Sequence, residues 1–316
     1  MRVKYVKIGS GEYFMGMEKN ETSEGSLFSL FLGCLAILGA IALVAVQVLY
    51  ITFGKSKGLI YSSDMLFFSG CAVALCLIHM SILLFGGRNM KRIFVIVISC
   101  IMLVGAVGLI GYGYVHTKAQ KSLIRTVSPD KNYAAIFKTD SSSGKIRYYR
   151  DFYTLFGKEK EVIPFTSKEK LHCQWVSNDV CAVTGISKDG NIWQYAATFG
   201  DRGDGTTYSN MINSLSVEWL ASNGKKDNQL EVTQEKIIVN IDGVKEEFDF
   251  ENCVQYGTLA LVLCNEESEA KWMISLNEDA HLDPELLTVE KNGTCSLLKV
   301  SMEKEKPIIF TSMGNN

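Results

Sequence analysis

One loop in the second half of the chain brings acidic residues and glycines together, "GDRGDGTTYSN" at residues 200–210. Asp201 and Asp204 carry carboxylate oxygens, which Ca²⁺ prefers as ligands, and flexible glycines let a loop close around an ion. The loop lacks the Asp-x-Asp-x-Asp-Gly run and the later bidentate Glu of a calcium-binding loop. We therefore expect a solvated turn and no metal, and keep Asp201 and Asp204 as the two metal candidates.

Other residue patterns with known chemistry do not occur in the sequence. It has no His-Glu-x-x-His, no Gly-x-Ser-x-Gly, no phosphate loop and no dinucleotide-binding glycine pattern. His172 and Cys173 are adjacent, but neighbours on a strand point to opposite faces, so they do not suit a base and its nucleophile. The sequence predicts no catalytic residue and no cofactor. A surface hydrolase, with residues brought together from distant segments, stays open as an alternative.

Two cysteines, Cys173 and Cys181, flank the segment "WVSND" at residues 175–179. If this segment closes a hairpin, the two sulfurs face each other on paired strands and can form a disulfide. The alternative is a pair of ordinary strand cysteines with free thiols. The second part of the chain holds five cysteines, so at least one of them stays unpaired if the compartment is oxidising.

The elements that must position any site fall into two parts, and the first part is apolar. Three stretches, at about residues 27–53, 65–87 and 93–115, contain no charged side chain apart from their flanks. About 20 apolar residues in a helix cross the hydrocarbon core of a bilayer, so each stretch predicts a transmembrane helix. We therefore expect a polar tail at residues 1–25 and a three-helix membrane region at 26–115.

The orientation of the chain follows from its basic residues in short loops. The N-terminal tail and the loop at 88–92 hold seven Lys/Arg, against five in the loop at 54–64 and just after the third helix. This bias predicts a cytoplasmic N-terminus and an extracytoplasmic C-terminal domain in a plasma membrane.

After a linker at residues 116–127, the pattern changes to short alternating runs and turns over residues 128–316. Alternation with period two and strands at regular spacing predict an all-β domain, either a partial propeller-like sheet stack or a two-sheet sandwich. Asp242-Gly243 and Asn292-Gly293 each suit a type I′ hairpin turn. The four tryptophans lie in alternating runs, so we expect them in the core.

One segment of this domain resembles a known family. The turn and strand "SPDKNYAAIF" and the following "WVSNDVCAVTG" are similar to the Ser-Pro-Asp strand segment and the Trp-turn-strand segment of PD40/TolB-like β-propeller blades. Ser128, Pro129 and Asp130 match the family turn, whereas Lys131 stands where that family usually has Gly. The resemblance covers residues 128–199, about one blade, and implies an interaction module without implying any reaction.

Charge and composition narrow the function further. Residues 116–316 hold 23 Lys/Arg and 29 Asp/Glu, and this acidic balance excludes nucleic acid as a partner. The sequence thus predicts a multi-pass membrane protein that presents a non-catalytic binding domain to a membrane or envelope protein, with the lipid bilayer around its helices. The alternative is an accessory subunit of a membrane transporter or sensor complex.

Overall fold

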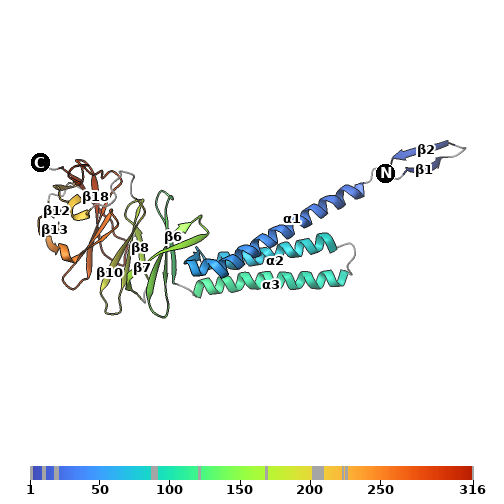
Figure 1. Ribbon diagram of the computed structural model, residues 1–316, viewed down its shortest axis with the longest axis horizontal. Coiled ribbons are helices and arrows are strands. Elements are labelled where there is room, and N and C mark those ends of the chain that lie inside the picture. Colours follow the sequence, from blue (N-terminus) through green and yellow to red (C-terminus); the bar gives the residue numbers. More distant parts are fainter. Residues whose placement is uncertain are drawn as a thin grey trace. The chain divides into compact units, whose positions relative to one another are not determined.

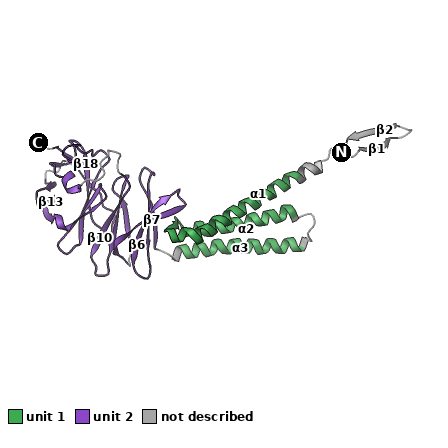
Figure 2. Ribbon diagram, in the orientation of Figure 1, with its two compact units in different colours: residues 1–120 green, residues 121–316 purple. Residues whose placement is uncertain are grey.

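The structure is a computed structural model that describes residues 3–8, 12–17, 21–86, 92–119, 122–167, 170–200, 210–222, 224 and 227–314. The chain divides into two compact units, Met1–Gln120 and Lys121–Asn316. Figure 2 shows the first in green and the second in purple. Three long apolar helices therefore precede a β-rich part, as the sequence predicts.

The three helices of the first unit are α1 (Glu21–Leu49), α2 (Asp64–Gly86) and α3 (Arg92–Ala119), shown in Figure 1. Segments Leu27–Lys57, Asp64–Phe85 and Ile93–Thr117 are long and apolar enough to cross a membrane. Helix α1 continues through a π-helical turn and a 3-10 turn and ends at Gly58, which adopts φ 72°. Glycine accepts this left-handed conformation at a helix end without the steric cost that a side chain brings.

Helix α2 packs against α1 on one side and α3 on the other. Gly113 of α3 permits the second contact, because a Cβ atom there would lie 2.7 Å from the Cβ of Phe68. Near the end of α1, the buried Gln47 accepts a hydrogen bond of 2.8 Å from the Tyr61 hydroxyl. Small residues and polar pairs such as Gln47 with Tyr61 thus contribute to the contacts between these elements.

Two short strand elements belong to this unit as well. Strands β1 (Val3–Ile8) and β2 (Glu12–Met17) form an antiparallel hairpin with Val3 opposite Met17, and β3 (Leu59–Tyr61) lies between α1 and α2 in the chain. The sequence analysis treated residues 1–25 as a tail and did not predict this hairpin. Residues 116–127, expected as a linker, hold the end of α3 and strand β4 (Leu123–Val127).

The described strands of the second unit form four antiparallel sheets, more than the two sheets of the sandwich alternative. The first sheet runs from β4 through β7 in chain order, and the second from β8 through β10. A third sheet has the order β11-β19-β18-β17-β16-β15, and a fourth has the order β12-β13-β14. The remaining bounds are β5 (Ala134–Thr139), β6 (Lys145–Phe152), β7 (Phe156–Thr166), β8 (His172–Trp175), β9 (Val180–Ile186), β10 (Ile192–Thr198), β11 (Trp219–Ala221), β12 (Gln229–Val232), β13 (Lys236–Ile241), β14 (Val244–Asp249), β15 (Cys253–Tyr256), β16 (Ala260–Cys264), β17 (Ala270–Leu276), β18 (Thr294–Lys299) and β19 (Ile308–Ser312), with a short helix α4 (Met211–Ser214).

The described sheets share three hydrophobic cores, and several strands, β9 and β16 among them, contribute to a core on each face. In β9, Cys181 and Val183 belong to the core against the first sheet, whereas Val180 and Ala182 belong to the core against the third sheet. Strand β16 alternates in the same way. Val262 belongs to the same core as Val180 and Ala182, whereas Leu261 and Leu263 belong to the third and largest core. Because successive strand residues point to opposite faces, a strand buried on both sides reads as an unbroken apolar run. This explains "VCAVTGI" and "ALVLC" and makes the second unit a stack of sheets.

The predicted positions of the tryptophans and of one hairpin turn can also be compared with the structure. Trp219 and Trp272 are buried in the largest core, and Trp175 and Trp193 pack against another, so the predicted core role of the tryptophans is confirmed. Asp242 and Gly243 have φ of 50° and 84°, which fits the predicted type I′ turn between β13 and β14. The residues that resemble one propeller blade, 128–199, extend over the first and second sheets.

Candidate functional site

The residues that the sequence singled out do not form a common site. Asp201 and Asp204 lie in 201–209, outside the described residues. Cys173 and Cys181 lie on the paired strands β8 and β9, but the register sets Cys181 opposite Trp175 and Cys173 opposite Val183. The two cysteines are thus offset diagonally, whereas the sequence analysis expected them opposite each other if residues 175–179 closed the hairpin. The turn is centred one residue later, since the Val176 N–H donates to the Val180 carbonyl and residues 177–179 form the loop. Both are free thiols in this structure, and the disulfide stays a prediction.

The surroundings of these thiols suit the alternative reading. Both cysteines contact the core between the first and second sheets. Burial raises the pKa of Cys173 to about 12 and raises that of Cys181 as well, so both are protonated at neutral pH. A protonated, buried thiol is a poor nucleophile and behaves as a small apolar group.

A pocket of about 330 Å³ opens at one end of the first sheet. We call it the arginine pocket. Its lining comes from the turn before β5, the end of β6 with the turn after it, and the residue after β10. The lining residues are Arg125, Val127, Lys131, Asn132, Tyr133, Ala134, Arg150, Asp151, Tyr153, Thr154 and Phe199.

The Ser-Pro-Asp turn leads into one wall of the arginine pocket, which Lys131, Asn132 and Tyr133 form. The Ser128 hydroxyl donates to the Asp130 carboxylate at 2.5 Å and accepts from the Tyr133 N–H at 3.0 Å. Asp130 also accepts from the N–H of Asn132 at 3.1 Å, and these bonds lower the pKa of Asp130. Lys131 takes φ 66°, the conformation that the family glycine would adopt with no side-chain cost. Lys131 thus adopts a conformation that usually favours glycine.

Arg150 forms the opposite wall. Its Nη2 donates to the carbonyl oxygen of Thr198 at 2.9 Å, and its guanidinium lies 5.2 Å from the centre of the Phe199 ring. Its Nε is buried and has no hydrogen-bond partner among the described residues. The hydrogen bond from the Phe199 N–H to the Asp179 carbonyl, 2.9 Å, fixes the ring. A guanidinium on an aromatic face is a stable arrangement that still leaves N–H donors for other groups.

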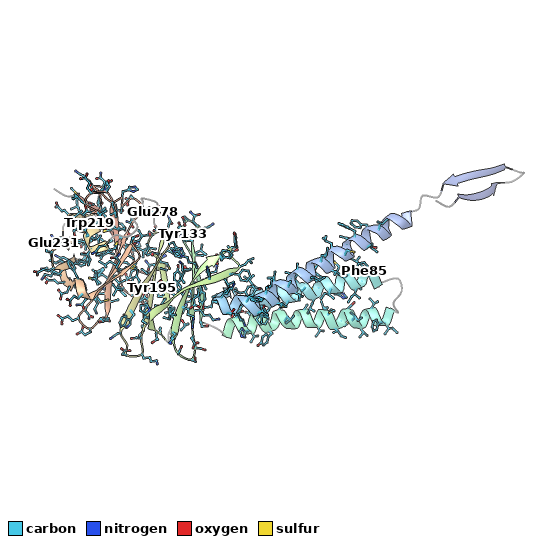
Figure 3. The ribbon with its side chains drawn as sticks, in the orientation of Figure 1. Phe85, Tyr133, Tyr195, Trp219, Glu231 and Glu278 are labelled. Atoms are coloured by element: carbon cyan, nitrogen blue, oxygen red, sulfur yellow. The ribbon has the colours of Figure 1, made fainter. Side chains whose placement is uncertain are left out.

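Aromatic rings surround Phe199 on several sides. The ring centroids of Tyr133 and Trp175 lie 5.1 Å and 5.4 Å from that of Phe199. The Trp175 indole N–H donates to the Thr126 hydroxyl at 2.9 Å, which ties the second sheet to β4. Figure 3 labels Tyr133 on the second unit. The pocket therefore rests on rigid sheet residues, as binding sites usually do.

The charges of the arginine pocket are unequal. Arg125, Lys131 and Arg150 contribute three positive charges, against the single carboxylate of Asp151. Arg125 binds that carboxylate with two hydrogen bonds, 3.4 Å from Nε and 3.2 Å from Nη2. Lys131 and Arg150 have no acidic partner among the described residues. A net positive charge remains at the pocket.

The turn between β6 and β7 carries exposed apolar side chains beside the pocket. Phe152 and Leu155 are exposed, and Tyr153 has 79% of its surface exposed. Tyr153 and Thr154 both have positive φ, 51° and 57°, and such a conformation is uncommon for residues with a side chain. Aromatic side chains that protrude from a tight turn are typical anchors for a partner. We call Phe152, Tyr153 and Leu155 the aromatic tip.

No family model matches this sequence, and no curated protein is significantly similar to it. The site is therefore interpreted from its own geometry. Among the described residues, no group of three or more His, Cys, Asp or Glu side chains is placed to hold a metal ion. The sequence analysis found the turn at Ser128 but missed Arg150 and Phe199. These two residues are far apart in the chain, so no motif spacing in the sequence connects them.

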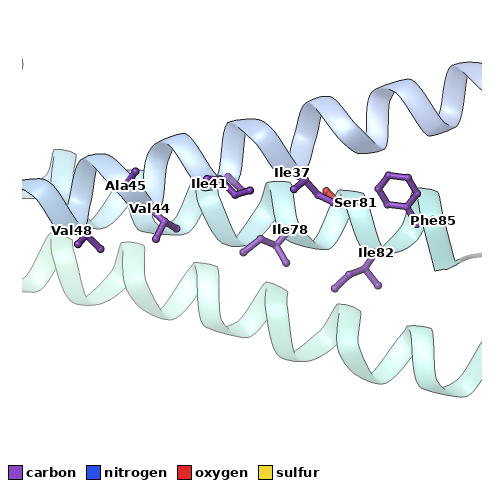
Figure 4. Close-up of a pocket in the computed structure, with 10 residues that line it drawn as sticks. Ile37, Ile41, Val44, Ala45, Val48, Ile78, Ser81, Ile82 and Phe85 are labelled. Carbon is purple, nitrogen blue, oxygen red and sulfur yellow. The ribbon is translucent and has the colours of Figure 1, made fainter.

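The first unit carries a second hollow, the apolar groove, of about 720 Å³. Figure 4 shows side chains of α1 and α2 around it, with Phe85 at one end. Ser81 is its one polar lining residue. The others are Ile37, Ala40, Ile41, Val44, Ala45, Val48, Ile78, Ile82 and Phe85.

Proposed function

We propose that this protein is a multi-pass membrane protein whose β part is a non-catalytic binding domain on the extracytoplasmic side. The observation that supports it most is the arginine pocket beside the aromatic tip. A rigid pocket with unpaired cations and exposed aromatic residues resembles the anchor regions of binding surfaces, which are enriched in Arg, Tyr and Trp.

The apolar helices supply the membrane part of the proposal. Segments that are long enough to cross a bilayer, and that expose large apolar side chains along their length, need an apolar solvent around them. Three crossings leave the two ends of the helical region on opposite sides. The bias of basic residues then favours a cytoplasmic N-terminus and an extracytoplasmic second unit. The partner would be a membrane or envelope protein.

The propeller resemblance agrees with this role. Blades of that family commonly serve as interaction modules, and Lys131 to Tyr133, which directly follow the Ser-Pro-Asp turn that carries the resemblance, line the arginine pocket. Sheets that stack through shared cores give a stiff support for such a turn.

Site-specific photo-crosslinking tests the proposal. A photoreactive residue at position 153, in the aromatic tip, should give a discrete crosslinked product in membranes that contain the natural partner. The same residue at position 244 is the matched control, since Val244 is 65% exposed but lies on the fourth sheet. Equal product from both positions, or none from position 153, would argue against binding at the tip.

The second candidate is an accessory subunit of a membrane transporter or sensor complex, and the apolar groove favours it. A partner helix could lie along Ile37 to Val48 and use the small, exposed side chain of Ala45 for close approach. Copurification of one larger membrane protein, lost when Ala45 is replaced by Phe, would support this candidate. Retention of the same protein by that variant would count against it.

A further inference from the structure

The charge balance of the arginine pocket indicates what kind of ligand it accepts. Three cationic side chains line a small volume, and the one carboxylate among the described lining residues is already bound by Arg125. The Arg150 side chain is half-buried and its Nε is buried without a hydrogen-bond partner among the described residues, whereas Lys131 is exposed. Because moving a charge out of water is costly, a negatively charged ligand would compensate that cost at Arg150, and Lys131 would add its attraction at the rim of the pocket.

The hydrogen-bonding capacity of Arg150 indicates which anion fits. A guanidinium has five N–H donors, and Arg150 uses one of them for a neutral carbonyl, that of Thr198. The planar fork matches the two oxygens of a carboxylate or phosphate better than it matches a spherical ion. Stacking on Phe199 holds the plane of the fork before any ligand arrives, which lowers the entropy cost of binding.

Lys131 adds a second cation at a fixed place. Its backbone is set by hydrogen bonds within the turn, including that from the Lys131 N–H to the Ser128 carbonyl at 3.0 Å. Its side chain forms no ion pair with the described residues. The two cations thus come from separate elements, a turn and the end of a strand, and meet at one pocket.

The apolar part of the lining limits the rest of the ligand. Val127, Ala134 and Tyr133 face the same pocket, and its volume of about 330 Å³ lies at the lower end of the range for small-molecule sites. Such a pocket has room for one acidic group on a compact apolar or aromatic body.

We propose that the arginine pocket binds a small organic oxyanion, a carboxylate or phosphate on an apolar body. The side chains of Arg150 and Lys131 bind its charged oxygens. This inference rests on the proposed binding function and specifies its chemistry. It assigns no reaction to the site.

Calorimetric titration of the full chain in detergent micelles tests the inference. The probes are phenyl phosphate, benzoate and the neutral benzyl alcohol. Both anions should bind and the alcohol should not, and the affinity should fall as salt is added, because screening weakens exposed charge pairs. Tighter binding of phenyl phosphate indicates a phosphate ligand, and tighter binding of benzoate a carboxylate ligand. Equal binding of benzyl alcohol would overturn the proposal.

Variants locate the binding. Lys131→Gly keeps the backbone of the turn and removes the cation, and should raise the Kd about tenfold, the usual effect of losing one charge-assisted contact. Arg150→Gln should raise it further. Lys138→Gln is the matched control, because Lys138 lies on β5 opposite Leu123, at the other end of the first sheet. An unchanged Kd in Lys131→Gly would overturn the proposal even if Arg150→Gln fails to fold.

The two proposals can fail separately. Anion binding without a crosslink from position 153 would leave the anion site in place and remove the macromolecular partner at the tip. A crosslink without anion binding would support a macromolecular partner at the tip and would rule out the anion site.

Discussion

Lys131 holds an unusual backbone conformation at the edge of the arginine pocket. An L-residue in the left-handed region costs about 1–2 kcal/mol relative to the right-handed one. The hydrogen bonds that Ser128 and Asp130 make across the turn offset this cost. A lysine here therefore reduces stability while it adds a cation, which is the pattern expected when a turn residue serves binding.

Substitutions at this position should separate the two effects. Lys131→Gly should change the free energy of unfolding by less than about 1 kcal/mol, toward greater stability, because relief of strain exceeds the added chain entropy. Lys131→Val should reduce it by about 1–2 kcal/mol, since a β-branched side chain fits positive φ poorly. Thermal unfolding followed by circular dichroism gives both values. A Val variant as stable as the Gly variant would contradict the strained turn.

Asp140 makes a similar network at the other end of the first sheet. Its carboxylate accepts from the Ser142 hydroxyl at 2.5 Å and from the N–H groups of Ser142 and Ser143 at 2.9 Å each. These hydrogen bonds, that of the Ser142 hydroxyl first, lower the pKa of Asp140 well below its ordinary value of 3.8.

This shift predicts a pH dependence. Because the folded pKa lies below the unfolded one, the contribution of Asp140 is complete above pH 3.8 and is lost as pH falls toward the folded pKa. Asp140→Asn should therefore be less stable than the parent at pH 7, and the difference should shrink below pH 3.8. Denaturant midpoints across this range measure it. Asp189→Asn, in the turn after β9, is the matched control and should leave the denaturant midpoint at pH 7 unchanged, because the Asp189 carboxylate accepts no hydrogen bond from the described residues.

At the scale of elements, close helix packing and doubly buried strands define the two units. Gly113 faces the Phe68 ring of α2, whereas Gly111 has nothing within 4 Å of the position of a Cβ. The two glycines lie two residues apart on α3, so they differ in packing more than in intrinsic helix propensity.

This difference makes a matched pair of substitutions. Gly113→Ala should destabilise the helices by about 1–3 kcal/mol, because the Phe68 Cβ cannot move without its backbone. Gly111→Ala should be neutral or slightly stabilising, since Ala favours the helix over Gly. Loss of helicity on titration with a denaturing detergent measures both. Equal sensitivity of the two variants would mean that α2 and α3 do not pack as described.

The sequence predicts elements well where one physical signal dominates. Charge-free runs identified the three helices, and period-two alternation identified most strands of the second unit. Two similar dipeptides, Asp242-Gly243 and Asn292-Gly293, however, adopt different conformations. Asp242-Gly243 forms the expected turn, but Gly293 lacks a positive φ and instead allows close contact, 2.7 Å from the Val289 Cγ1 to a Cβ placed there. The backbone conformation at Gly293 depends on tertiary contacts, which the local sequence does not reveal.

The site was less predictable than the fold. The Ser-Pro-Asp turn was visible because its residues are contiguous. Arg150 and Phe199 lie 49 positions apart in the numbering and meet only because β6 and β10 end at the same side of a shared core. Which strand ends meet depends on how the sheets stack, and that follows from the faces each strand buries.

At the scale of the whole molecule, sidedness is the property that the proposal most depends on. The native thiols of the second unit are poor reporters of it. Cys295 is fully buried, and burial raises the pKa of Cys253 to about 12 and that of Cys264 to about 11. Thiol reagents attack the thiolate, so these cysteines should react slowly on either side of a membrane.

An introduced cysteine should report sidedness directly. Val244→Cys places an exposed thiol beside the β13–β14 turn. A membrane-impermeant maleimide should label this variant in intact cells and leave the parent nearly unlabelled. Labelling that requires lysis would place the second unit in the cytosol and would end the extracytoplasmic proposal.

Strand β19 lies between β18 and β11, so residues from the far end of the chain complete a sheet whose outer strand is made much earlier. Phe310, fully buried, fills the core only when this strand is in place. During synthesis, strand β11 (Trp219–Ala221) therefore stays unpaired until strand β19 (Ile308–Ser312) has been made. A chain truncated before β19 would leave the edges of β18 and β11 unpaired, and we expect cellular proteases to degrade such a chain.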